Sequence, residues 1–108
     1  MRLYIGGAYQ GQEELARQEN PGADVIEDFH EVIRRVMAGG GDPCDYARAL
    51  CRERPAAAVV SNEVGAGVVP MDAEERAWRE GVGRALCVIA QAAETVTRVV
   101  CGIGVRIK

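Results

Sequence analysis

Several absences in the sequence narrow what this protein can be. No two of its four cysteines form a C-x-x-C pair, and a single histidine accompanies them, so the usual ligand spacing of a zinc or redox site is missing. No apolar run approaches the ~20 residues of a membrane helix. The first apolar stretch is also too short for a secretory signal. We therefore expect a cytoplasmic protein with no membrane partner and with reduced, buried thiols at Cys44, Cys51, Cys87 and Cys101.

The chain also lacks an excess of basic residues. Its 13 Lys and Arg residues face 16 Asp and Glu residues, which gives a net charge of −3. Binding to nucleic acid requires a basic face, so we expect no nucleic-acid partner. With 108 residues, 48% hydrophobic and 27% charged, the composition is that of a soluble globular protein, and we expect one domain over residues 1–108.

Short apolar runs alternate with amphipathic stretches along the chain. This order predicts an α/β fold of three layers, with a mostly parallel sheet flanked by helices. Helix caps are expected at Asp42 and Asp72, and the glycines at 81 and 83 indicate close approach to another backbone or a ligand. The expected strands are 2–5, 24–26, 56–61 and 95–101, followed by a turn at 102–104; the expected helices begin near 14, 29, 42 and 72, and the last ends near 94.

The first strand leads through a glycine-containing turn into a helix, which is the setting of a phosphate-binding loop. Laid on the pattern G-x-x-x-x-G-K-[ST], the glycines fall at Gly6 and Gly11, with Gly7 between them. Gln12 stands where a lysine should reach the phosphates, and Glu13 stands where a hydroxyl should hold magnesium. Either Glu13 replaces the phosphate at the helix start, or the backbone amides alone bind a nucleotide.

A second polar turn follows the apolar run at 56–61. It reads Asn62-Glu63-Val64-Gly65, with Gly67 two residues on. Side chains at this point leave the carboxyl end of a strand, where ligands of open α/β sheets bind. Asn62 and Glu63 are therefore candidate nucleotide-binding residues, and Glu63 is also a candidate catalytic residue. The alternative is a tight turn in which Glu63 bonds backbone amides.

Residues 59–70 and the terminal stretch 99–108 together resemble one known family. They read Val-Val-Ser-Asn-Glu-Val-Gly-Ala-Gly-Val-Val-Pro and Val-Val-Cys-Gly-Ile-Gly-Val-Arg-Ile-Lys. The family is that of adenosylcobinamide kinase and adenosylcobinamide-phosphate guanylyltransferase, from cobalamin biosynthesis. The resemblance implies a reduced form of the P-loop nucleotide-hydrolase fold. It also implies GTP or ATP with magnesium as cofactors, a corrinoid ligand and assembly into a homo-oligomer.

Two residues near the second expected strand gain alternative interpretations from this resemblance. In the family an aspartate at the end of such a strand helps to hold magnesium, which makes Asp28 a candidate metal and catalytic residue. The alternative, which we favour, is that Asp28 caps the following helix, with Glu31 completing a capping box. The family also uses a histidine that becomes guanylylated. Its segment is missing here, so we expect His30 to be an ordinary, partly exposed helix residue.

The long helix departs from the family pattern at its end. Trp78, Arg79, Glu80 and Gly83 match an aromatic, arginine, acid and glycine, whereas Leu86 and Cys87 replace a final asparagine-glutamine pair. Apolar replacements are compatible with a self-association surface. With the loop lysine and the nucleophile segment missing, we expect a catalytically impaired or accessory homologue. The alternative is a residual nucleotide-binding transferase that acts on adenosylcobinamide.

Overall fold

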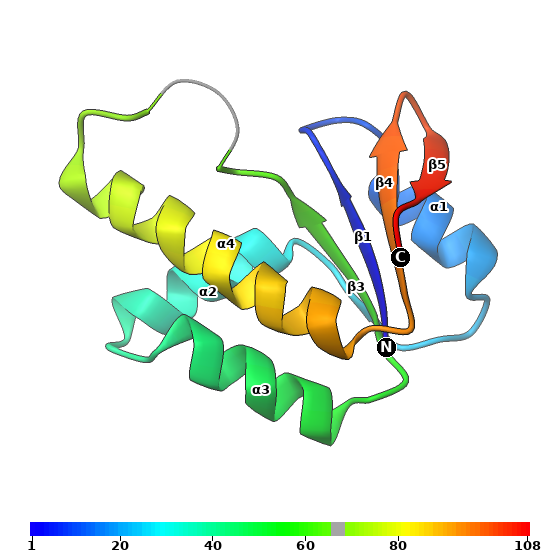
Figure 1. The fold of residues 1–108 in the computed structure, drawn as a ribbon, viewed down its shortest axis with the longest axis horizontal. Coiled ribbons are helices and arrows are strands. Elements are labelled where there is room, and N and C mark those ends of the chain that lie inside the picture. The colour runs from blue at the N-terminus through cyan, green and yellow to red at the C-terminus, as the bar shows by residue number, and fades with distance from the viewer. Residues whose placement is uncertain (66–68) are drawn as a thin grey trace.

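The computed structural model describes residues 1–65 and 69–108, and its centre is a five-stranded sheet in the order β2-β3-β1-β4-β5 (Figure 1). The strands β1, β2, β3 and β4 run parallel to one another, and β5 pairs with β4 in antiparallel orientation. This confirms the predicted α/β fold and agrees with a P-loop-like arrangement. The elements are β1 (Arg2–Gly6), α1 (Gln12–Glu19), β2 (Val25–Ile26), α2 (Phe29–Ala38), α3 (Pro43–Glu53), β3 (Ala58–Asn62), α4 (Ala73–Ala92), β4 (Thr95–Val100) and β5 (Ile103–Arg106).

Each face of the sheet carries its own apolar core, because alternate residues of a strand point to opposite faces. Leu3 of β1 lies opposite Val59 and Val96, and all three face the larger core with α2, α3 and α4. Tyr4 and Val60 face the smaller core, where Ala16 of α1 is fully buried. Figure 1 shows the resulting layers, with α1 alone on one side of the sheet. No helix among the described residues is long and apolar enough to cross a membrane.

Two of the predicted helix caps are confirmed. The side chain of Asp42 accepts a hydrogen bond from the N–H of Asp45 at 2.9 Å, and Asp72 accepts one from Glu74 at 2.8 Å. Backbone hydrogen bonds between neighbouring residues also end α2. The N–H groups of Gly40 and Gly41 bond the carbonyls of Met37 and Val36, with Gly40 at φ 83°, which is a Schellman motif.

The expected turn at 102–104 is placed wrongly. The turn consists of Cys101 and Gly102, at φ 51° and φ 76°, and β5 already begins at Ile103. Two consecutive residues with positive φ form the tight turn that matches the twist of a β-hairpin. A cysteine is an unusual residue at such a position, which is why the sequence pattern did not reveal the hairpin.

The expectations for the glycines of α4 and for the cysteines are only partly met. A Cβ atom at Gly81 would lie 2.6 Å from the sulfur of Met37, so this position does require close approach, although to a side chain. At Gly83 a Cβ would meet no described atom within 4 Å, so no described backbone approaches this glycine closely. Cys44 and Cys51 are half-buried, but Cys87 and Cys101 are exposed, so the cysteines are not uniformly buried.

A buried polar cluster fastens the end of α1 to the sheet. The hydroxyl of Tyr4 donates to the carboxylate of Glu19 at 2.7 Å and accepts from the amide of Asn20 at 2.9 Å. The same Asn20 amide donates to the Ala16 carbonyl, and the Asn20 oxygen accepts from Arg2. Burial, followed by the hydrogen bond to Glu19, raises the pKa of Tyr4, because both favour the protonated hydroxyl.

This cluster predicts a loss of stability at alkaline pH. Because the folded-state pKa of Tyr4 lies above its ordinary value of about 10, the stabilisation is fully present below that pH. It is lost as pH rises through the folded-state pKa. In urea unfolding between neutral and strongly alkaline pH, Tyr4→Phe should flatten this dependence. Tyr9→Phe, at a fully exposed tyrosine, is the matched control and should leave it unchanged. Equal slopes in all three proteins would contradict the prediction.

Candidate functional site

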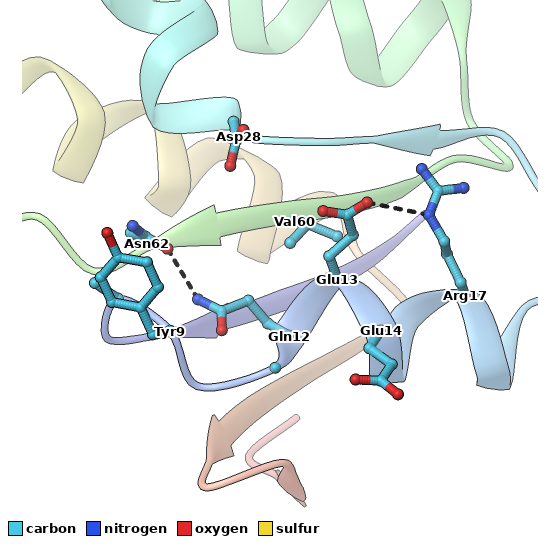
Figure 2. A pocket seen from close by; sticks show the side chains of 10 residues that line it. Tyr9, Gln12, Glu13, Glu14, Arg17, Asp28, Val60 and Asn62 are labelled. Carbon is cyan, nitrogen blue, oxygen red and sulfur yellow. Dashed lines mark hydrogen bonds and ion pairs between the residues drawn. The ribbon is translucent and has the colours of Figure 1, made fainter.

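A cleft of about 620 Å³ opens at the carboxyl ends of β1 and β3. The sheet register places Gly6 of β1 directly beside Asn62 of β3, so the two polar turns expected from the sequence meet here. This edge is where open parallel sheets bind ligands. Figure 2 shows the cleft, which is lined by Ala8, Tyr9, Gly11, Gln12, Glu13, Glu14, Arg17, Asp28, Val60 and Asn62.

The side chain of Gln12 closes the loop that follows β1. Its amide nitrogen donates to the carbonyl oxygens of Gly6 at 3.3 Å and Gly7 at 3.0 Å. The same nitrogen donates to the side-chain oxygen of Asn62 at 2.9 Å (Figure 2). Gln12 is 5% exposed, so these bonds lie largely away from water. A neutral amide, directed inward at the loop's own oxygens, therefore stands in the position of the phosphate-binding lysine.

The far side of the same loop is held by the β4–β5 turn. Gln10 accepts hydrogen bonds from this turn twice, through its side chain from Cys101 at 2.7 Å and through its carbonyl from Gly102 at 2.8 Å. Gly11, at φ 86°, then begins α1 in a conformation that favours glycine. A Cβ atom at Gly11 would also lie 3.4 Å from Gly102. The loop is thus held on one side by Asn62 of β3 and on the other by the turn between β4 and β5.

Acidic side chains dominate the charge of the cleft. Glu13, Glu14 and Asp28 line it, and among the described lining residues Arg17 is the only cation. The guanidinium of Arg17 bonds Glu13 at 3.2 Å and also pairs with Glu27. These hydrogen bonds, that to Glu13 first, raise the pKa of Arg17. Glu13 is a residue of the first turn of α1, where negative charge stabilises a helix, and its carboxylate pairs with Arg17 one turn further along.

Asp28 does not cap α2 in the predicted way. It stands at the N-cap position, but at φ 48° and ψ 50° its side chain forms no capping hydrogen bond. Its backbone carbonyl bonds the N–H groups of Glu31 and Val32 instead, and the Glu31 carboxylate lies 3.3 Å from Arg34. The capping-box interpretation is therefore wrong, because a left-handed backbone turns the side chain away from the helix end. The Asp28 side chain borders the cleft, across β3 from Gln12 (Figure 2).

His30 is buried, contrary to the expected partial exposure. It is 7% exposed, and its Nδ1 accepts a hydrogen bond from the backbone N–H of Asn62 at 3.2 Å. The accepting Nδ1 places the ring proton of a neutral imidazole on Nε2. Trp78 of α4 donates to the His30 carbonyl at 2.8 Å. The His30 ring therefore holds the end of β3 through the backbone of Asn62. Sequence spacing did not reveal this role because the contact joins residues 32 positions apart.

The remaining candidate residues lie beside the cleft or outside it. The backbone N–H of Glu63 bonds the Gly6 carbonyl at 2.8 Å, and its carboxylate lies 3.8 Å from Arg98. Leu86 is half-buried against the larger core, and Cys87 is exposed. Gly65 would meet no described atom within 4 Å of a Cβ, and Gly67 lies outside the described residues. Glu63 thus links β1 and β3 through its backbone, while its side chain turns toward β4.

The known proteins that this chain resembles belong to one biosynthetic pathway. The model of a family described as cobinamide kinase / cobinamide phosphate guanyltransferase matches residues 43–107. The bifunctional adenosylcobalamin biosynthesis protein CobU of Salmonella typhimurium is 48% identical over 61 residues, which are 56% of this chain and 34% of that protein. The protein of the same name from Escherichia coli strain K12 gives the same identity and coverage. The aligned part thus spans about a third of the length of these relatives.

The geometry around Gly6 predicts a structural role for this glycine. A Cβ atom at Gly6 would lie 2.6 Å from the backbone oxygen of Val99 in the neighbouring strand, which cannot move aside like a side chain. We expect Gly6→Ala to lower the free energy of unfolding by about 1–3 kcal/mol. At Gly7 the same atom would meet only the flexible Gln10 side chain at 3.7 Å.

Gly7→Ala is therefore the matched control, with an expected change within about 0.5 kcal/mol. Both values follow from urea unfolding monitored by circular dichroism. Equal destabilisation by the two substitutions would refute the assignment of Gly6 to strand packing.

Proposed function

Because the chain belongs to the cobinamide kinase / cobinamide phosphate guanyltransferase family, we propose that it serves cobalamin biosynthesis as an accessory, catalytically impaired homologue of CobU. In this role it transfers no phosphoryl group by itself. The observation that carries the proposal is the Gln12 amide, which stands at the lysine position and is bonded to the loop's own carbonyls.

Charge at the cleft supports the proposal. Phosphoryl transfer relies on positioned positive charge around the phosphates. Here Gln12 supplies none, and the guanidinium of Arg17 is shared between two carboxylates. Glu13 adds a negative charge where the hydroxyl ligand of magnesium would stand. Two like charges ~4 Å apart repel by ~1–4 kcal/mol between the dielectric constants of water and of a protein surface. These residues do not fit a magnesium-bound nucleotide in the manner of a phosphate-binding loop.

One observation favours the alternative of a residual nucleotide-binding transferase. The Asp28 side chain does not cap its helix and borders the cleft with Asn62. A carboxylate in that place is able to attract a hydrated magnesium ion. The nucleotide phosphates would then rest on backbone amides between Gly6 and Gly11 alone.

The accessory role includes association between copies of this chain. Four aliphatic side chains on the α4 face of the hairpin are about half or more exposed, namely Val100, Ile103, Val105 and Ile107. Beside them β5 forms the edge of the sheet and leaves one backbone edge unpaired within the described residues. Two copies of such an edge are self-complementary through an antiparallel pairing about a twofold axis. We propose a second copy as the occupant of this surface.

A titration with nucleotides tests the catalytic part of the proposal. We expect no heat of binding when GTP or ATP with magnesium is titrated into the natural protein by calorimetry. Gln12→Lys/Glu13→Ser should create micromolar binding, because it restores the lysine and the hydroxyl of the loop pattern. Gln91→Lys/Glu94→Ser makes the same change of net charge at two exposed residues that do not line the cleft, and it should stay silent.

Micromolar binding by the natural protein would overturn the impaired assignment and favour the residual transferase. In that case Asp28→Asn should abolish the magnesium dependence. Silence from the natural protein and from Gln12→Lys/Glu13→Ser alike would show that the phosphate site itself is lost, which leaves the accessory role and excludes the residual transferase.

Sedimentation velocity tests the association between copies. The natural chain should sediment as an oligomer, and Val105→Lys should shift it toward the monomer, because a charge would enter an apolar contact. Met71→Lys is the control, since Met71 is 95% exposed and distant from β5 in the sequence. A natural chain that is monomeric at its highest soluble concentration would refute this part of the proposal.

A further inference from the structure

A second, smaller pocket lies at the opposite end of the sheet from the cleft. Its volume is about 270 Å³, and it is formed by the end of α1 together with β1, β4 and β5. The sheet register brings the lining residues of neighbouring strands side by side. Arg2 lies opposite Thr95, Tyr4 opposite Thr97, and Thr97 opposite Arg106. All of these side chains point to the α1 face, which α1 alone covers. The family comparison assigns no role to this end of the sheet.

The floor of the pocket is polar and buried. Tyr4, Asn20 and Thr97 are 2%, 6% and 6% exposed. The bonds among Tyr4, Asn20, Glu19 and Ala16 use the phenol hydroxyl and both amide hydrogens of Asn20. The hydroxyl of Thr97, in contrast, has no hydrogen-bond partner within the part of the chain that the structure describes. No buried side-chain nitrogen or oxygen among the described residues lacks a partner, so this hydroxyl is reached by solvent from the pocket, where its donor is available to a ligand or to water.

Two arginines stand at the rim of the pocket. Arg2 donates one N–H to the Asn20 oxygen at 2.6 Å, and Arg106 donates its Nε hydrogen to the Lys108 carbonyl at 3.2 Å. No aspartate or glutamate in residues 1–65 or 69–108 forms an ion pair with either guanidinium, and Arg106 meets the main-chain oxygen of Lys108. A guanidinium carries five N–H donors, so most of theirs are available. The pocket therefore combines one unused hydroxyl donor with two guanidinium groups that have no aspartate or glutamate in ion-pair contact among the described residues.

We propose that this pocket binds a small oxyanion, a phosphate or a carboxylate group, through Arg2, Arg106 and the hydroxyl of Thr97. Guanidinium groups bind such oxyanions with two parallel hydrogen bonds, and these charge-assisted bonds are stronger than neutral ones. The buried floor limits the access of water on one side, which strengthens each of them. The proposal does not depend on the function of the cleft.

The carboxylate of Glu19 lowers the affinity of the site for an anion. It lines the pocket, where it accepts the hydrogen bond of Tyr4 and repels an anion. Glu19→Gln removes this negative charge and keeps an oxygen that accepts from Tyr4. The variant should therefore bind an oxyanion several-fold more tightly. A gain of affinity cannot result from partial unfolding, so this variant tests the site independently of its structural role.

The test is a titration of the full chain with inorganic phosphate, followed by amide chemical shifts at constant ionic strength and pH. We expect saturable binding with a Kd of about 1 mM, which corresponds to about −4.1 kcal/mol. The shift changes should centre on Thr97, Arg106 and Arg2. A parallel titration with succinate separates the two sources of the oxyanion, since the tighter ligand identifies phosphate or carboxylate as the preferred group.

Two variants should weaken binding by about tenfold each, the loss expected for one charge-assisted hydrogen bond. They are Arg106→Gln and Thr97→Val. Valine keeps the shape of the threonine side chain. Arg98→Gln, on the same strand as Thr97 but on the other face, is the matched control and should bind as the natural chain does. Shift changes confined to Gly7, Gly11 and Gln12, unchanged affinity in both variants, or no saturation by either anion would each overturn the proposal.

Discussion

The amide of Gln12 is the contact on which the cleft depends. It joins the carbonyls of Gly6 and Gly7 to the side chain of Asn62, and so connects β1, the loop, α1 and β3 in one group. The bond to Gly6 is buried and the other two are partly buried, and a buried acceptor left unmet would cost ~1–3 kcal/mol. Gln10 on one side and His30 on the other hold the parts in register. The loop is thereby complete without an anion.

The two ends of the sheet differ in charge. At the carboxyl end, Glu13, Glu14 and Asp28 line the cleft with one arginine, Arg17, which pairs with Glu13 and Glu27. At the amino end, Arg2 and Arg106 face one carboxylate that is already bonded to Tyr4. Anions are therefore disfavoured where the fold usually binds phosphates and favoured where it usually binds nothing. The sheet, about five residues long, separates the two environments.

The family match and the cleft overlap only in part. Residues 43–107 supply α3, β3, α4, β4 and β5, and hence Asn62 and the turn that holds Gln10. Gln12, Glu13, Asp28 and His30 lie before the matched residues. The strands and helices that contact the loop thus lie mostly in the part that matches the family, whereas the loop itself carries the residues that argue against phosphoryl transfer. The accessory role proposed above rests on the loop residues, and the family membership rests on the part aligned with CobU, which covers about a third of those relatives.

The sequence by itself determined the α/β fold, most of the elements and the caps at Asp42 and Asp72, because apolar periodicity and capping act over a few neighbouring residues. It also indicated Gly6, Gly11, Gln12 and Asn62, since motif spacing locates the ends of strands. Only the tertiary structure decided how these residues interact. That the Asp28 side chain forms no capping hydrogen bond depends on a left-handed backbone, and the Cys101–Gly102 turn requires a cysteine, which rarely adopts that conformation, beside a glycine. The burial of His30, the inward amide of Gln12 and the alignment of Arg2, Thr97 and Arg106 arise from contacts between distant strands and helices, which no local pattern records.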